Sequence, residues 1–128
     1  MNVISAILLA AGQSKRIRGE NKLLKKYKGK ILINHILKSL IKSKVNKIII
    51  VLSYENRKIK KIALKSKKIT FVINSQHLKG ISTSIKCGLK KISKKNIGFL
   101  IAHADMPLVS KTILNTLCSA LKSKNKEI

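Results

Sequence analysis

The sequence has few acidic residues, few aromatic residues, a single proline and no long apolar run. Only four of its 128 residues are acidic, namely Glu20, Glu55, Asp105 and Glu127. No apolar run approaches the roughly 18 residues that a membrane-spanning helix needs, so we expect no membrane span. No basic segment precedes the short apolar run at the N-terminus, so we do not expect a secretory signal peptide.

Cysteine is also scarce. The chain contains only Cys87 and Cys118, which lack the close spacing of metal ligands. Both fall at positions where an amphipathic helix needs a small apolar residue. This usage is typical of a chain that stays reduced, and we therefore expect a cytoplasmic protein.

Positive charge is abundant instead. Lysine and arginine total 29 against the four acids, which gives a formal net charge of +25. A field of this size attracts polyanions, so non-specific binding of nucleic acid or nucleotides is expected. The lysines are spread over the whole chain, and only two Tyr and two Phe accompany them. A dedicated nucleic-acid-binding protein usually clusters its cations and adds stacking aromatics, so that alternative rests on net charge alone.

Strand and helix patterns alternate along the chain. Four nearly continuous apolar runs predict buried parallel strands at 3–10, 47–53, 69–73 and 97–103. Apolar residues at helical spacing follow each run, over 33–41, 59–63, 81–92 and 113–121. The alternation predicts one α/β domain over residues 1–128, a three-layer α/β/α Rossmann-like sandwich with a mostly parallel sheet. Ligands bind such sheets at the carboxyl ends of the strands.

The first strand ends at a glycine that a basic loop follows. Gly12 permits a tight turn, Ser14 adds a hydroxyl, and Arg16 and Lys22 add cations. Backbone amides and cations in such a loop can hold a polyphosphate. The spacing matches neither the P-loop nor the G-x-G-x-x-G fingerprint, so a solvated surface loop is the alternative.

The fourth strand ends at Asp105, one of the few acids, directly before Met106 and the only proline, Pro107. A carboxylate that faces a phosphate-binding loop is a natural ligand for Mg²⁺. The alternative is that Asp105 caps the next helix, although Ser110 is better placed for that role.

The third strand ends at Asn74, and the chain then breaks at Gly80. Three hydroxyl residues, Ser82, Thr83 and Ser84, crowd the start of the following helix. Hydroxyls and free amides at a helix N-terminus can bind a ribose, a base edge or a phosphate. Ordinary helix capping is the alternative interpretation.

Three stretches together resemble the MobA/MocA-type nucleotidyltransferases, which attach CMP or GMP to molybdopterin. They are LAAGQSKRIRGENKLL (9–24), GISTSIKCGL (80–89) and ADMPLVS (104–110). The resemblance runs over residues 3 to about 117 and implies the Rossmann-like nucleotidyltransferase fold. Within the family, LAAG in place of LAGG favours the cytidylyl branch, so CTP is the favoured substrate and GTP the alternative.

The resemblance also implies roles for individual residues. Nucleotide contacts are implied for Leu9, Ala10, Ala11, Gly12, Ser14, Asn74, Gly80, Ser82 and Ser84. Arg16 would hold the triphosphate, Lys22 would neutralise the α-phosphate, and Asp105 would bind Mg²⁺. The implied reaction is in-line attack by the phosphate of a molybdopterin-type acceptor on the α-phosphorus, with pyrophosphate as leaving group.

Members of the resembled family are longer than this sequence. The resemblance therefore implies a fold that is incomplete at its C-terminal end, without the later strands, a second acidic metal ligand and most of the acceptor pocket. Two alternatives to an active transferase follow. The first is a nucleotide-binding remnant without turnover, and the second is a half-enzyme whose fold a partner chain completes. A fragment of a longer reading frame is a further interpretation of the short length.

Overall fold

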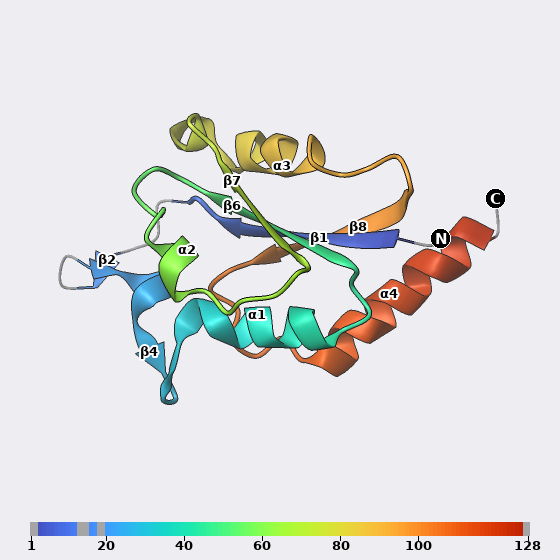
Figure 1. The fold of residues 1–128 in the computed structure, drawn as a ribbon, viewed down its shortest axis with the longest axis horizontal. Coiled ribbons are helices and arrows are strands. Elements are labelled where there is room, and N and C mark those ends of the chain that lie inside the picture. Colours follow the sequence, from blue (N-terminus) through green and yellow to red (C-terminus); the bar gives the residue numbers. More distant parts are fainter. Residues whose placement is uncertain (1–2, 13–15, 18–19, 127–128) are drawn as a thin grey trace.

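The computed structural model describes residues 3–12, 16–17 and 20–126, and a parallel four-stranded sheet forms its centre (Figure 1). The strands are β1 (Val3–Ala10), β6 (Lys47–Leu52), β7 (Ile69–Ile73) and β8 (Asn96–His103). They lie in the order β7-β6-β1-β8 and all neighbours run parallel. β1 is therefore flanked on both sides, which suits its almost uninterrupted apolar sequence.

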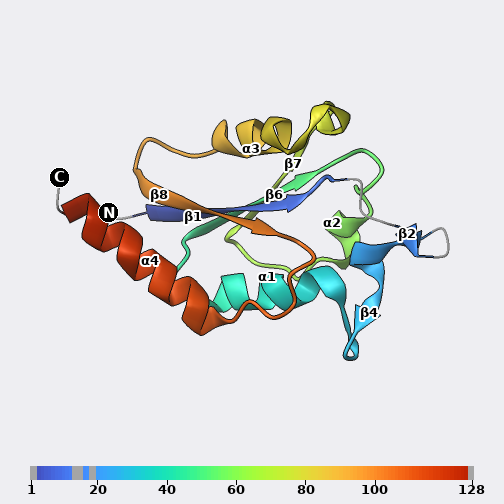
Figure 2. The ribbon, with the colours of Figure 1, turned by 180° about the vertical axis from the view of Figure 1, so that it is seen from behind.

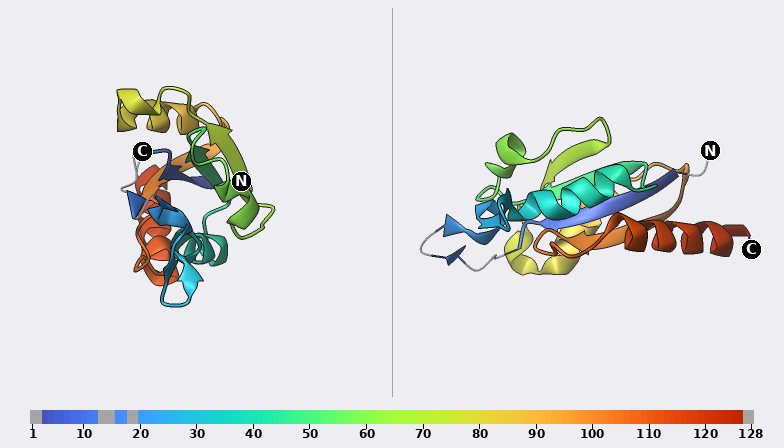
Figure 3. Two further views of the ribbon diagram at one scale, coloured as in Figure 1. Left: turned by 90° about the vertical axis from the view of Figure 1, so that its left-hand side faces the viewer. Right: turned by 90° about the horizontal axis from the view of Figure 1, so that it is seen from below.

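In the described part of the chain, three α-helices cover one face of the sheet and one α-helix covers the other. The helices are α1 (Leu32–Lys42), α2 (Ile59–Ile62), α3 (Ile81–Leu89) and α4 (Lys111–Lys126). The end-on and lower views show α3 on one side of the sheet, and α1, α2 and α4 on the other (Figure 3). The predicted three-layer α/β/α sandwich is thus confirmed.

The two faces of the sheet bury cores of unequal size. The face of α1, α2 and α4 holds the larger core, which includes Ile33, Ile36 and Leu37 of α1. The α3 face holds a smaller core, built on Ile7, Leu9, Ala11, Ile49 and Val51. Alternate residues of β1 contribute their side chains to the two cores, because successive side chains of a strand point to opposite faces.

Gly88 lets α3 approach the sheet closely. A Cβ atom at this position would lie 2.7 Å from Cγ2 of Ile7, a distance that real side chains do not tolerate. The absence of a side chain at Gly88 therefore sets the spacing between α3 and β1.

Several short elements join the main ones. Two-residue strands form one hairpin from β2 (Arg16–Ile17) and β3 (Glu20–Asn21), and another from β4 (Lys26–Tyr27) and β5 (Lys30–Ile31). The 3₁₀ helices η1 (Lys22–Leu24) and η2 (His77–Lys79) follow β3 and β7. Sequence patterns did not predict these elements, because none is long enough to show a hydrophobic period.

The predicted boundaries hold with two adjustments. α2 is a single turn, and α3 ends at Leu89, although Ile92 beyond its end still packs on the smaller core. Ser110 accepts a hydrogen bond from the Ile113 amide (3.2 Å), which confirms it as the better-placed cap of α4. Asp105 lies earlier, in a turn directly after β8.

β8 forms one edge of the sheet, and α4 packs along it (Figure 2). Leu100 and Ala102 face the larger core, whereas Phe99 and Ile101 point to the other face and are 40% and 44% exposed. We call Phe99 and Ile101 the β8 strip. No charged residue or proline interrupts β8 between Ile97 and Ala102, so β8 lacks protection by charge or proline against strand pairing. Within the described ranges, no helix has the length and apolar character to cross a membrane.

Candidate functional site

A cavity of about 640 Å³ opens at the carboxyl ends of the central strands. Because all four strands are parallel, the segments that follow them meet at this one edge of the sheet. The lining residues come from β1, η1, η2, α3 and the turn after β8, and they are Leu9, Ala10, Gly12, Lys22, Leu23, His77, Leu78, Gly80, Ile81, Ser84, His103, Ala104 and Asp105. The cavity therefore lies where the sequence patterns place a ligand.

Lys22 and Asp105 pair across this cavity. Nζ of Lys22 lies 3.7 Å from Oδ2 of Asp105, and the two side chains are 41% and 48% exposed. The turn that carries Asp105 is fixed to β1 by a hydrogen bond from the Ala104 amide to the Leu9 carbonyl (3.0 Å). An exposed ion pair of this kind contributes only about 0–1 kcal/mol to stability, so both groups can change partners when a ligand enters.

Asn74 ties the end of β7 to the start of α3. Its side-chain amide donates to Oγ1 of Thr83 and to Oγ of Ser84, each at 2.9 Å. Its Oδ1 accepts from the Gln76 amide at 2.9 Å, and its backbone amide donates to the Leu52 carbonyl at 2.7 Å. The polar atoms of Asn74 thus organise the loop that borders the cavity.

α3 begins without a side-chain cap. Gly80 occupies the cap position with a φ of +120°, and no side chain accepts a hydrogen bond there. Ordinary capping by the hydroxyl residues is therefore not what the structure shows, because Ser82, Thr83 and Ser84 all lie inside the helix. The positive end of the helix dipole faces the cavity at Gly80 and Ile81, which favours an anionic or polar ligand.

The structure brings most of the predicted site residues together. Leu9, Ala10, Gly12, Lys22, Gly80, Ser84 and Asp105 all line the cavity. Ala11 instead packs in the smaller core, Asn74 is buried behind the cavity wall, and Ser82 is exposed on α3. Ser14 lies outside the described residues, and for Arg16 only the backbone, in β2, is described.

Sequence reasoning missed two histidines of the cavity wall, His77 of η2 and His103 at the end of β8. Nδ1 of His77 is buried without a hydrogen-bond partner in the described part of the chain. The position of both residues at strand exits was the available signal, but neither belongs to a motif that carries a recognised role.

Among the described residues, no group of three or more His, Cys, Asp or Glu side chains could hold a metal ion. Asp105 is the single acid among the described residues that line the cavity. Lys22 is the one lysine among the described residues that line the cavity. The cavity thus offers one carboxylate, one ammonium group, a helix start and strand-end backbone, a set suited to a polyphosphate.

The family model of the MobA-like NTP transferase domain matches residues 6–128. A curated relative, the bifunctional protein GlmU of Clostridium tetani, is 30% identical over 115 residues, which cover 88% of this chain and 24% of that protein. The chain therefore spans about a quarter of the length of this curated relative.

Solved structures agree on the fold. Rv0371c of Mycobacterium tuberculosis H37Rv matches with a TM-score of 0.79 at 19% identity, over 92% of this chain and 59% of its own. The 4-diphosphocytidyl-2C-methyl-D-erythritol synthase of Anaerococcus prevotii matches with a TM-score of 0.76 at 23% identity, over 94% of this chain and 51% of its own. The cavity, the motif order and the family model agree, and the chain belongs to the MobA-like NTP transferase domain family.

Proposed function

We propose that this chain binds a nucleoside triphosphate, CTP before GTP, and transfers the nucleoside monophosphate to a phosphorylated acceptor of the molybdopterin type, with release of pyrophosphate. The observation that carries the proposal is the pairing of Lys22 with Asp105 across a cavity at the strand ends. We place the reaction in the cytoplasm, and the free thiols of Cys87 and Cys118 support a reducing compartment.

Each wall of the cavity has a part in this proposal. The backbone from Leu9 to Gly12 borders the triphosphate, and the Lys22 ammonium neutralises charge at the α-phosphate as the acceptor attacks. The start of α3, with Gly80 and Ser84, borders the base and ribose. Arg16 and Ser14 add donors to the phosphates, as their place in the glycine-led loop suggests. The protein positions the groups and stabilises charge, which is what phosphoryl transfer requires.

The chemistry of Asp105 fits Mg²⁺ that arrives with the nucleotide. Mg²⁺ in such sites is usually held by one or two carboxylates together with phosphate oxygens and water. A single exposed carboxylate beside the cavity meets that need, whereas a resident metal site would require more ligands than the described residues supply. When bound, the ion would screen phosphate charge.

The choice of CTP rests on two indications that agree. The LAAG sequence at the end of β1 favours the cytidylyl branch of the family. One structural neighbour is also named for a diphosphocytidyl product. GTP is therefore the second nucleotide to test.

The test is pyrophosphate release by the full chain with Mg²⁺, molybdopterin and each NTP in turn. Release with CTP, abolished by Asp105→Asn and reduced at least tenfold by Lys22→Met, is the expected result, because a charge-assisted phosphate contact is worth roughly 1.5–3 kcal/mol. Lys90→Met is the matched control, since Lys90 is an exposed lysine at the far end of α3 that does not line the cavity. Equal release by Lys22→Met and Lys90→Met would contradict the proposal.

A second candidate is a nucleotide-binding half whose fold a partner chain completes. The β8 strip favours it, because Phe99 and Ile101 are exposed and, among the described strands, β8 pairs on one side only. The candidate predicts CTP binding by the folded chain without pyrophosphate release. It also predicts that Ile101→Lys prevents association with the partner and leaves CTP binding unchanged.

A further inference from the structure

Two buried asparagines lie beside the proposed phosphate site, and the proposed function gives them no role. Asn21 directly precedes η1 and Lys22, and Asn56 lies in the turn that follows β6. Their exposed fractions are 7% and 4%. Burying a primary amide is unfavourable unless its polar atoms are hydrogen-bonded, so the partners of this pair are informative.

The two side chains form a relay from η1 to the end of β1. Oδ1 of Asn21 accepts from the Leu23 amide at 2.9 Å and caps η1. Nδ2 of Asn21 donates to Oδ1 of Asn56 at 2.5 Å. Nδ2 of Asn56 in turn donates to the carbonyl of Ala10 at 2.5 Å. The loop that carries Lys22 is thus fixed to the last residue of the central strand.

A separate hydrogen bond also holds Asp105 close to β1. The amide of Ala104, its neighbour, donates to the carbonyl of Leu9, which precedes Ala10 in β1. Both members of the Lys22–Asp105 pair are therefore held against consecutive residues of β1, one through the asparagine relay and one directly. The relay fixes the backbone at Lys22, whereas the Lys22 side chain is partly exposed.

We propose that Asn21 and Asn56 are positioning residues that set the Lys22 ammonium for the phosphates of the bound nucleotide. The inference rests on the proposed function, because it takes Lys22 as a phosphate contact. A long lysine side chain on a short loop loses conformational freedom when it binds, and fixing its backbone beforehand lowers that cost. Pre-organised supporting residues of this kind hold a functional group in its productive geometry.

The test is a double-mutant cycle on binding of inorganic tripolyphosphate and of CTP, measured by isothermal titration calorimetry. Asn56→Ala should weaken binding about tenfold when Lys22 is present. In the Lys22→Met background the same substitution should change binding less than twofold, because a positioning residue acts only through the group that it positions.

Two further variants keep the test decisive. Asn21→Ser retains a side chain that can cap η1 but removes the bond to Asn56, so it should reproduce the loss with little effect on folding. Asn34→Ala is the matched control. Asn34 is 6% exposed, donates to the Ile62 carbonyl (3.1 Å) and accepts from the Leu64 amide (3.0 Å), so its side chain bonds to the α2 segment and not to Asn21 or Asn56. It should leave tripolyphosphate binding unchanged.

The outcomes separate the two proposals. An equal loss for Asn56→Ala in both backgrounds, or the same loss from Asn34→Ala, would overturn the positioning role and leave the phosphate contact of Lys22 intact. Unchanged binding by Lys22→Met alone would overturn the role of Lys22 in the proposed function. If Asn56→Ala does not fold, Asn21→Ser measures the same coupling.

Discussion

The Lys22 ammonium and the Asp105 carboxylate lie 3.7 Å apart, although one follows the first strand of the sheet and the other follows the last. In this arrangement each charge partly neutralises the other. A triphosphate would draw the ammonium towards its oxygens and would be repelled by the carboxylate unless a cation lies between them. Binding of nucleotide and binding of divalent cation should therefore strengthen each other.

The effect of Asp105→Asn on CTP affinity should change sign when Mg²⁺ is present. Without Mg²⁺, the substitution removes a repelling charge, so CTP should bind up to about fivefold more tightly, in line with roughly 0.2–1 kcal/mol for exposed charges. With Mg²⁺, the variant should lose most of the metal-dependent gain in affinity. Calorimetric titrations with and without Mg²⁺ measure both effects. Tighter metal-free binding combined with a full Mg²⁺ response would place the cation elsewhere.

Gly88→Ala should destabilise the fold by up to about 2 kcal/mol, because its Cβ would lie 2.7 Å from Ile7 and would push α3 away from β1, a strain of about 1–3 kcal/mol. This strain should outweigh the roughly 1 kcal/mol that alanine gains over glycine in a helix. Urea denaturation measures the change. Gly12→Ala is the stability control, since a Cβ there meets no atom within 4 Å. Equal midpoints for both variants would show that α3 can shift freely.

Cys118 should react with thiol reagents only when the protein opens. Its side chain is fully buried beneath α4, and burial raises the pKa of the thiol above its ordinary value of 9.0 more strongly than nearby Lys122 and Lys44 lower it. The folded chain therefore keeps this proton at a pH where the unfolded chain loses it, so the contribution of Cys118 to stability should fall as the pH rises above 9.0. The rate at which iodoacetamide alkylates a Cys87→Ser variant, measured at increasing urea concentrations, reports how strongly the fold protects Cys118. Rapid alkylation of the folded Cys87→Ser variant without urea would contradict this protection.

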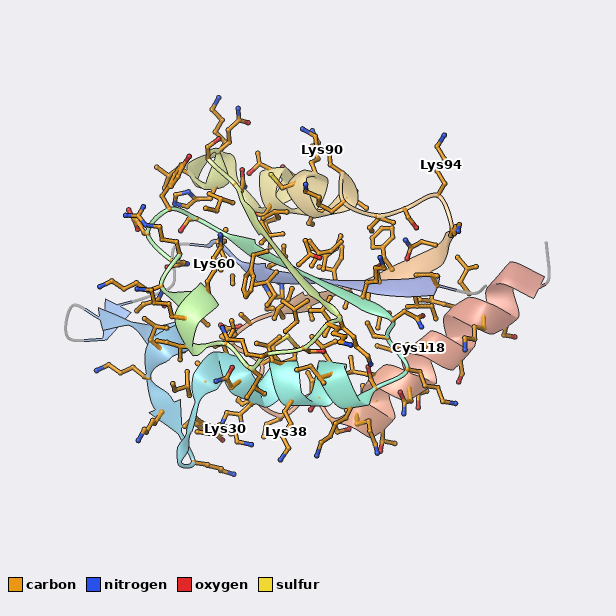
Figure 4. The ribbon with its side chains drawn as sticks, viewed as in Figure 1. Lys30, Lys38, Lys60, Lys90, Lys94 and Cys118 are labelled. Carbon is orange, nitrogen blue, oxygen red and sulfur yellow. The ribbon has the colours of Figure 1, made fainter. Side chains whose placement is uncertain are left out.

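The net charge should produce polyanion binding that the cavity does not control. Lysine side chains extend from separate parts of the fold, with Lys30 and Lys38 on the side of α1, and Lys90 and Lys94 on the side of α3 (Figure 4). Lys30 and Lys38 even lie close enough for Lys38 to lower the pKa of Lys30. Binding of a labelled oligonucleotide should fall steeply between 50 and 200 mM salt, on the order of what counterion release predicts. Asp105→Asn should not change it, whereas a strong effect of that variant would link nucleic acid to the cavity.

Much of the sheet could be predicted because its strands are long and apolar. Val3–Ala10 and Asn96–His103 are confirmed within a residue of the predicted runs, and the alternation with helices implied their parallel arrangement. α2 is shorter than the other described α-helices because its apolar pattern covers one turn only. The two small hairpins escaped prediction for the same reason, since Arg16–Ile17 and Lys26–Tyr27 are too short to show any period.

The cavity could be predicted where a motif meets a strand end, as at Gly12, Lys22 and Asp105. The asparagine relay could not be predicted from the sequence. Asn21 and Asn56 are far apart in sequence, and each alone is typical of a solvated turn. Their pairing depends on how β1 and β6 lie side by side, which is a property of the folded sheet rather than of either segment.

The unequal cores on the two faces of the sheet mean that the two walls of the cavity rest on different amounts of buried apolar surface. Lys22 and Leu23 belong to the side that the larger core supports, whereas Gly80, Ile81 and Ser84 belong to α3, which rests on the smaller core. A ligand that bridges the two walls therefore also holds α3 down on the sheet. Nucleotide occupancy should therefore be visible as slower amide hydrogen exchange in α3.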